Sequence, residues 1–339
     1  MGLLVVNSDY ERLYGVSETP PEPTREELTQ MYLTFEALED GSIGVNIPSG
    51  VGTSLVTSVS YSIDEGETWT TTNNVDSTEI NIVVDNVKKG DKILWKGSAT
   101  SYSTTGSSTK NLQFISLGNI DIYGNIMSLL YGDDFIDYVK LTATSVFKNL
   151  FNKLKVVNAK GLVLPSILSY GCYQSMFFGC DSLTTAPELP ATTLRPSCYN
   201  SMFTGCDSLT TAPELPATTL TESCYAYMFN GCDSLTTAPE LPALTLASNC
   251  YNSMFEGCIS LTTAPELPAT TLANKCYNRM FHLCTSLNYI KMLASTVSSS
   301  NMTEWVTEVS PTGTFVKASG VEISTGTSGI PSGWTVEEV

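Results

Sequence analysis

The chain has 339 residues, and 42% of them are hydrophobic, which is enough for the cores of two or three domains. Its 17 basic and 34 acidic residues give a formal net charge of -17. That balance argues against nucleic acid and against an anionic membrane surface as partners, because both require clustered Lys and Arg. No apolar run approaches the ~20 residues needed to cross a bilayer, so no membrane insertion is expected.

Residues 1–31 are predicted to form an arm and linker separate from the rest of the chain. The start has no basic segment and an apolar run of four residues, so it does not match a secretory signal peptide. We therefore expect a cytoplasmic chain, or one that leaves the cell without a standard export signal. Residues 19–24 predict a stiff proline-rich linker, and a short helix should begin near Thr24. The arm is expected to anchor on another protein through its apolar run, Leu3, Leu4, Val5 and Val6.

Residues 32–125 have the pattern of a β-domain. Short segments rich in β-forming residues occupy 32–35, 59–63, 79–84 and 92–95, and Gly, Asp and Asn turns separate them. A segment of about 90 residues with this pattern predicts an immunoglobulin-like β-sandwich.

Two short motifs in this half are similar to parts of known enzymes. Residues 62–69, Ser-Ile-Asp-Glu-Gly-Glu-Thr-Trp, match the Asp-box of sialidases, which is a hairpin brace and not an active site. One copy cannot build a propeller, so we expect a hairpin with a packed Trp69. Residues 131–134, Tyr-Gly-Asp-Asp, match the tetrapeptide of viral polymerase metal sites, but the sequence shows no further carboxylates or basic template channel for two-metal catalysis. Residues 127–135 are instead expected to enter the first helix of a cap.

Residues 166–290 repeat with a period of 26. The leading Cys stands at 172, 198, 224, 250 and 276, and the segment Leu-Thr-Thr-Ala-Pro-Glu-Leu-Pro returns from residues 183, 209, 235 and 261. The units at both ends are degenerate, as a solenoid requires to close its core against water. We assign residues 126–165 and 291–339 as caps, and we expect terminal strands and a packed Trp334 in the second.

The residues of one unit alternate between two local patterns. Cys198, Met202, Phe203 and Cys206 have the spacing of one face of a short helical turn. Residues 209–215 fit a short strand, because two prolines limit its ladder hydrogen bonds.

This pattern resembles the BspA-like leucine-rich repeats of bacterial surface proteins. In that family a Leu-Thr-x-x-x-x-(Leu/Ile)-Pro strand alternates with an (Ala/Met)-Phe-x-x-Cys helical turn, and residues 209–216 and 202–206 match the two parts. The resemblance covers residues 146–290 and implies adhesion or recognition. The expected fold class is therefore mixed, with an N-terminal Ig-like β-sandwich followed by a leucine-rich-repeat solenoid with short strands and short helical turns.

The ten cysteines all follow the repeat, in two columns led by Cys172 and Cys180. None belongs to a close Cys pair, and the chain has a single histidine, His282, to which we assign no functional role. No metal and no cofactor are therefore expected. A disulfide ladder is an alternative, because coils stacked ~4.8 Å apart bring column neighbours into bridging range. Regular core positions favour buried free thiols.

The Leu-Thr-Thr-Ala-Pro-Glu-Leu-Pro runs are called linking segments, because they join one turn segment to the next. Near-identical coils place identical side chains in rows, so the Thr-Thr pairs and the Glu of the linking segments should form one flat polar face. Such a face suits a repetitive partner such as a surface polysaccharide, because weak contacts add up by multivalency. A plainer interpretation is that these Thr are strand formers and the Glu give solubility; binding would then belong to the variable positions Thr204, Asn230 and Glu256, or to the sandwich. The candidate residues are Thr184, Thr185, Glu188, Thr210, Thr211, Glu214, Thr236, Thr237, Glu240, Thr262, Thr263 and Glu266.

The order of β-domain, cap, repeats and a terminal Gly-Ile-Pro-Ser-Gly-Trp resembles proteins encoded by tailed phages of anaerobic gut bacteria. It implies a non-enzymatic virion structural protein of the head or tail. Its arm would bind other virion proteins, its sandwich would be a spacer, and its solenoid would bind a host surface protein or polysaccharide. A bacterial cell-surface adhesin of the same repeat family is the alternative. A carbohydrate-active enzyme is less favoured, because equally spaced Glu residues lack the unequal environments that separate an acid from a base. A homo-oligomer is left open.

Overall fold

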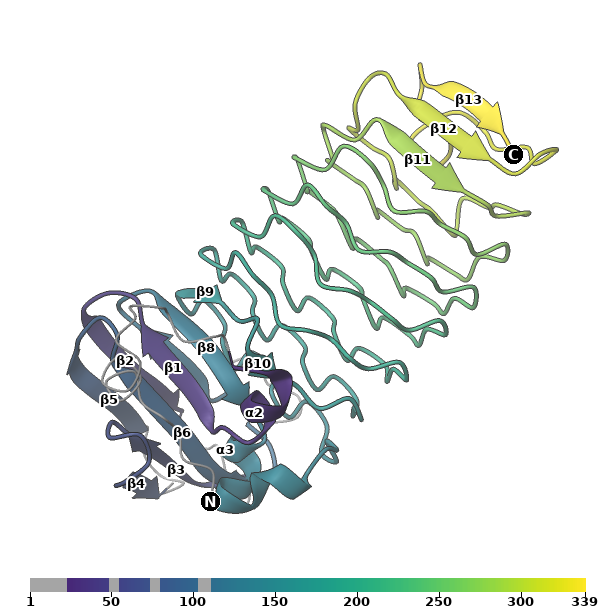
Figure 1. Cartoon of the computed structure of the whole chain (residues 1–339). Helices are drawn as coiled ribbons and strands as arrows, with labels where there is room; N and C mark the ends of the chain where they lie inside the picture. Colours follow the sequence, from purple (N-terminus) through teal and green to yellow (C-terminus); the bar gives the residue numbers. More distant parts are fainter. Residues whose placement is uncertain (1–22, 49–54, 74–79, 103–110) are drawn as a thin grey trace.

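The computed structural model describes residues 23–48, 55–73, 80–102 and 111–339. A β-domain at one end continues into a column of stacked coils, and a small parallel sheet closes the other end (Figure 1). The predicted anchoring run, Leu3 to Val6, lies outside the described residues.

The regular elements, in chain order, are α2 (Arg25–Thr29), β1 (Leu33–Ala37), β2 (Gly41–Ile47), β3 (Val56–Ser62), β4 (Thr70–Asn73), β5 (Ile80–Val87), β6 (Lys92–Ala99), β7 (Gln113–Ser116), β8 (Ile120–Asn125), α3 (Ser128–Tyr131), the 3₁₀ helix η1 (Gly132–Asp137), β9 (Val156–Asn158), β10 (Leu162–Val163), β11 (Tyr289–Met292), β12 (Thr314–Lys317) and β13 (Thr335–Glu338).

The N-terminal half contains two antiparallel sheets. Strands run in the order β8-β1-β6-β3-β4 in the first sheet and β5-β2-β7 in the second. The sheets pack on each other through aromatic rings: Phe35 and Trp95 of the first sheet lie 4.8 and 5.0 Å from Phe114 of the second, measured between ring centroids. The four predicted strand segments correspond to β1, β3, β5 and β6, so the β-rich prediction for this half is confirmed.

The Asp-box residues brace the hairpin between β3 and β4, as expected. The Asp64 carboxylate accepts hydrogen bonds from the Ser62 hydroxyl at 2.7 Å and from the Thr68 N–H at 2.9 Å. These bonds lower the pKa of Asp64 to about 2. Trp69 is half-buried and donates through Nε1 to the Gly66 carbonyl at 3.1 Å.

The β-domain is not the separate spacer that we expected, because its core continues into the coils. Strand β8 pairs antiparallel with β1 on one side and parallel with β9 and β10 on the other. The Phe114 and Tyr102 rings lie 5.8 and 6.1 Å from Phe151 and Phe147 of the first coil. One hydrophobic core therefore crosses the predicted boundary at residue 125 and extends from Leu33 to the C-terminal cap.

The described end of the predicted arm is not separate from the fold either. As expected, Thr24 caps α2 with a capping box that includes Glu27. The helix contacts the β8 and β10 strands, and the Asn125 side chain donates to the Thr29 carbonyl at 3.0 Å. Arg25 forms an ion pair with Glu188 of the coils. Residues 24–31 therefore belong to the folded body.

The predicted helical segments are runs of tight turns and not helices. Alternate N–H groups donate to the next coil: Tyr199 to the Cys224 carbonyl at 3.1 Å and Ser201 to the Ala226 carbonyl at 2.8 Å. An α-helix would use these donors within its own chain. Every fourth residue is left-handed, with φ of 56° at Ser201 and 69° at Gly205. The spacing predicted the buried face correctly but the hydrogen bonding wrongly.

The linking segments pair even less than expected. Between residues 164 and 288 they form single β-bridges, such as Thr211 with Thr237, instead of strands. Prolines remove N–H groups from these segments, which breaks any continuous ladder.

Aromatic rings stack in two columns along the coil axis. Tyrosine centroids from Tyr173 to Tyr277 are 5.7 to 6.1 Å apart, and phenylalanine centroids from Phe177 to Phe281 are 5.5 to 5.8 Å apart. Trp305 ends both columns, at 6.3 and 6.0 Å from the last members. Strands β11, β12 and β13 then form a parallel sheet, and the buried Trp334 confirms the predicted terminal packing.

We expect Gly205→Ala to lower the free energy of unfolding by about 1–2 kcal/mol, because the left-handed conformation penalises a Cβ. The added Cβ would lie 3.6 Å from the Gly179 Cα of the preceding coil, so crowding is ordinary and the cost comes mainly from φ. Chemical denaturation measures the change. Gly205→Asn is the control and should cost less, because Asn tolerates this region better. An Ala variant as stable as the wild type would contradict the strained-turn description.

Candidate functional site

The predicted Thr and Glu residues are all exposed at the surface. The structure brings Thr236, Thr237 and Glu240 of one coil together with Thr263 and Glu266 of the next around a hollow of about 500 Å³. Prolines, alanines and Leu241 line the rest of it. The hollow is open to solvent and not enclosed, so a ligand in it would keep part of its surface exposed.

The four carboxylates of the Glu column differ in their surroundings. Glu188 at one end pairs with Arg25, and Glu266 at the other end pairs with Lys291 at 3.0 Å. Glu214 and Glu240 form no ion pair with any described residue. The middle of the face therefore keeps an uncompensated negative charge, which favours neutral or cationic ligands.

Some of the threonine hydroxyls bond to the scaffold. The Thr184 hydroxyl donates to the Val157 carbonyl at 2.9 Å, and the Thr236 hydroxyl donates to the Thr210 carbonyl at 3.3 Å. These hydroxyls help to join neighbouring coils, and they still have acceptor lone pairs that face solvent.

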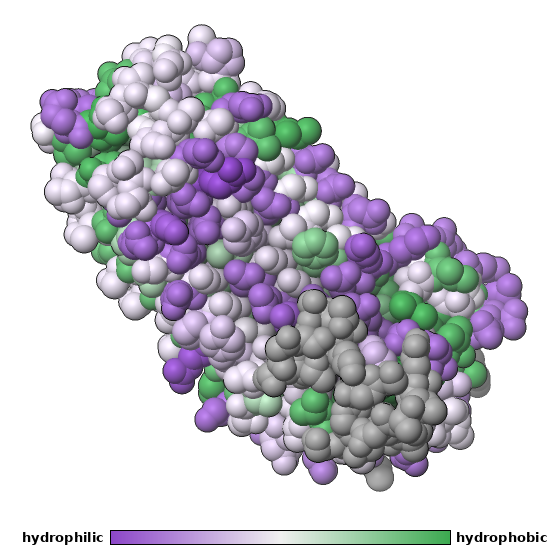
Figure 2. Space-filling view, turned by 180° about the vertical axis from the view of Figure 1, so that it is seen from behind, coloured by the Kyte–Doolittle hydropathy of each residue, from purple (hydrophilic) through white to green (hydrophobic). Residues whose placement is uncertain are grey.

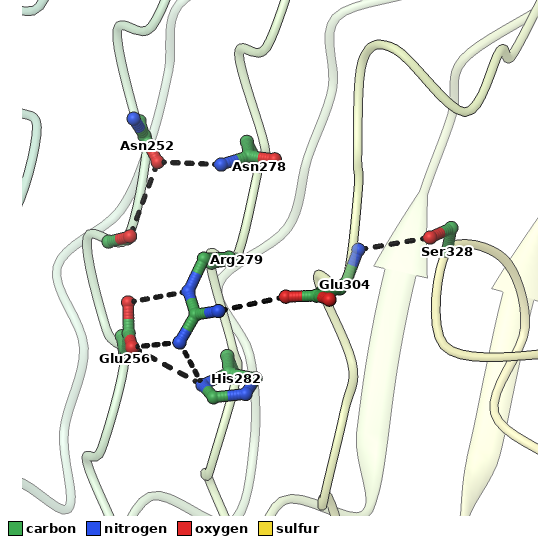
Figure 3. A network of polar contacts seen from close by, with 8 residues as sticks. Asn252, Glu256, Asn278, Arg279, His282, Glu304 and Ser328 are labelled. Atoms are coloured by element: carbon green, nitrogen blue, oxygen red, sulfur yellow. Dashed lines mark hydrogen bonds and ion pairs between the residues drawn. The ribbon is translucent and has the colours of Figure 1, made fainter.

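A polar network that sequence reasoning missed connects the last coils to the C-terminal cap (Figure 3). The Arg279 guanidinium donates to both oxygens of Glu256, at 2.6 and 3.3 Å, and to Glu304 at 2.8 Å. The His282 Nδ1 lies 2.9 Å from Arg279 Nη2 and 3.2 Å from Glu256 Oε1. The signal in the sequence was that Glu256, Arg279 and His282 occupy columns that hold small polar residues in most of the earlier coils, with Phe178 and Tyr227 as the exceptions.

The network holds its side chains in fixed positions. Burial alone would raise the pKa of Glu256, but the hydrogen bonds from Arg279 hold this pKa below its usual value. A bidentate guanidinium–carboxylate pair fixes both side chains in one geometry. Glu256 was an alternative binding position, and in the structure its carboxylate is occupied by its neighbours.

The Tyr-Gly-Asp-Asp residues form a structural contact. Asp133 accepts from the Lys96 ammonium at 2.7 Å and from the Tyr32 hydroxyl at 2.8 Å, and Lys96 lies 4.0 Å above the Trp69 ring. Burial, followed by the neighbouring Asp133, raises the pKa of Tyr32 to about 12. As expected, α3 and η1 occupy this segment.

All ten cysteines are buried free thiols, as the sequence favoured. Members of the second column donate their S–H to the phenylalanine carbonyl of the preceding coil, as Cys206 does to Phe177 at 3.2 Å and Cys232 to Phe203 at 3.1 Å. Burial raises the pKa of Cys232 to about 12, so it stays protonated as a donor.

The described residues hold no group of three or more His, Cys, Asp or Glu side chains arranged as metal ligands. No helix in the same part of the chain is long and apolar enough to cross a membrane. On the face seen in Figure 2, hydrophilic side chains cover much of the coil region, and hydrophobic ones form small scattered groups.

The chain matches no protein-family model, no curated protein and no solved structure.

Because the thiols are buried and protonated, we expect native protein at pH 8 to react with almost no thiol reagent, whereas denatured protein should expose ten thiols. Reductant should leave the melting temperature unchanged. A large drop under reduction would show that the columns are oxidised into a disulfide ladder in solution.

Two carboxylates face each other where the β-domain meets the coils. Glu36 of β1 lies directly opposite Asp121 of β8 in the antiparallel register, and like charges in that position destabilise a sheet. Burial, with the Glu36 charge as a further cause, raises the pKa of Asp121, while a backbone hydrogen bond from Asn158 opposes this.

We expect Asp121→Asn to raise the melting temperature at pH 7 by about 1–2 °C. A carboxyl whose pKa is raised on folding destabilises the fold when ionised, so the difference from wild type should shrink as pH falls and vanish below about 3, where the carboxyl is protonated in both the folded and the unfolded state. Thermal melts from about pH 3 to 8 test this. A gap that widens at acid pH would contradict it.

Proposed function

The exposed Thr pairs and Glu residues of the segments at 183–190, 209–216, 235–242 and 261–268 are called the Thr–Glu face. We propose that this chain is a non-enzymatic binding protein that presents this face to a polysaccharide or protein on a cell surface. The observation that carries the proposal is the column of exposed, in-register Thr pairs and Glu residues, held on a rigid stack and hollowed between two coils. Repetition lets individually weak contacts add up along the stack.

In finer terms, we propose that the coils form a leucine-rich-repeat solenoid of the BspA-like type. The 26-residue period, the buried Leu of each linking segment and the Met-Phe pair of each turn segment support this assignment. The Ig-like class of the β-domain is likewise a proposal, and the two packed antiparallel sheets support it.

We propose a phage particle as the setting, in its head or tail, with residues 1–22 as the segment that binds other virion proteins. The order of the chain's parts supports this, because a β-domain fused to one end of a stack leaves the long side of the stack accessible (Figure 1). A bacterial cell-surface adhesin with the same face is the second candidate.

Replacing both threonine pairs of the two central coils with lysine tests the face. The variant Thr210→Lys/Thr211→Lys/Thr236→Lys/Thr237→Lys should lose binding to host cells or to their extracted polysaccharide, because these four residues are exposed on it. Binding is measured by pull-down, and the melting temperature checks the fold.

The matched control is Thr218→Lys/Thr219→Lys, an equally exposed pair outside the hollow, which should bind as the wild type does. Undiminished binding by the fourfold variant would assign recognition to another surface of the molecule.

A further inference from the structure

The spaces between coils, here called seams, are not equivalent on the Thr–Glu face. In the seam between residues 209–216 and 235–242, Thr236 and Thr237 donate to the Thr210 carbonyl at 3.0 and 3.2 Å, and Ala212 donates to Thr237 at 3.1 Å. The seam between 261–268 and β11 is also bonded, with Ala264 donating to the Tyr289 carbonyl at 2.9 Å.

The seam between these two is open. No backbone hydrogen bond joins the described residues 235–246 to 261–272, although the sequence is nearly the same as in the bonded seam. The N–H groups of Thr262 and Thr263, equivalent to the donors at Thr236 and Thr237, have no backbone partner there. Backbone donors need a partner, so these are satisfied by water or by a ligand.

The hollow of about 500 Å³ lies in this open seam. It is lined by residues 236–242 of one coil and 263–268 of the next, so its long direction follows the chain and crosses the coil axis. Seven extended residues span roughly 20 Å, which is room for a short oligomer. The seam between 183–190 and 209–216 also lacks backbone bonds, but its Glu188 is occupied by Arg25.

The chemistry of the walls selects the ligand class. The four prolines at 239, 242, 265 and 268 have no N–H, so a peptide strand could not form a continuous ladder of hydrogen bonds along this seam. The exposed ring of Pro242 and the half-buried Pro265, Pro268 and Ala238 give an apolar lining that suits the C–H face of a sugar. Hydroxyls and carboxylates of the lining Thr and Glu suit sugar hydroxyls, and the negative charge repels acidic sugars.

We propose that the open seam between the coils of Glu240 and Glu266 is a binding groove for one short neutral or amine-bearing oligosaccharide, laid across the coil axis. This inference rests on the proposed function and refines it, because a single seam, and not the length of the columns, provides the binding site.

Filling the groove from the wall formed by residues 236–242 tests the inference. Calorimetry on the full chain would use cellohexaose and mannohexaose as neutral probes, a glucosamine hexamer as the amine-bearing probe, a galacturonic acid hexamer and a proline-rich peptide. We expect a neutral or amine-bearing probe to bind, and Ala238→Leu and Pro242→Tyr each to weaken it about tenfold. The equivalent variants at the bonded seam, Ala212→Leu and Pro216→Tyr, should stay within about twofold of wild type.

Two variants are made at each seam so that one poorly folded variant, identified by its melting temperature, does not decide the result. The groove proposal would be overturned by equal losses of binding at both seams, by preference for the acidic hexamer or the peptide, or by no binding of any probe. If the groove variants bind normally while the fourfold lysine variant does not, binding by the Thr–Glu face is supported and binding in the groove is contradicted.

Discussion

The hydrogen bonds between turn segments of successive coils fix the position of everything else in the stack. Alternate N–H groups leave their own coil to bond the next one, and this is achieved by placing every fourth residue in the left-handed region. That conformation costs about 1–2 kcal/mol at a non-glycine residue, so it persists only because the bonds and the packing over-determine it. The consequence is a stack in which each coil repeats the last in register, with two side chains inward and two outward along each turn segment.

The same constraint explains why the two sides of a coil behave differently. On the turn side, every repeat coil is bonded to the next, and the buried Tyr, Phe and Cys columns follow that spacing. On the Thr–Glu side, prolines remove some of the backbone donors, and bonded and open seams alternate along the stack. Exposed polar rows and room for a ligand therefore occur on the side where fewer backbone groups are hydrogen-bonded to a neighbouring coil. The turn side carries structural devices instead, including the Arg279 network that joins the last coils to the cap.

The ends of the stack show how a repeating core is closed. At one end, Phe35 and Phe114 of the two sheets contact Phe151 of the first coil, and Trp95 packs against both Phe35 and Phe114. Strand β8 supplies the first parallel edge. At the other end, the larger indole of Trp305 covers both aromatic columns at once. An uncapped coil would expose those rings to water, so the β-domain is part of the solenoid's stability as well as a domain in its own right.

The sequence by itself determined the period, the inward and outward positions, the exposed Thr and Glu rows, the buried free thiols and the packed Trp334. It could do so because a long, nearly perfect repeat has few ways to bury its apolar residues other than by stacking. It did not distinguish a helical turn from a run of tight turns, because a repeat of four residues and a helical repeat of 3.6 bury the same positions over so short a segment. Only the tertiary structure decided where each backbone donor goes, since the partner lies in the next coil, about 25 residues away in the chain. For the same reason only the structure joined the β-domain to the coils, paired Arg25 with Glu188, and left some seams open between bonded ones.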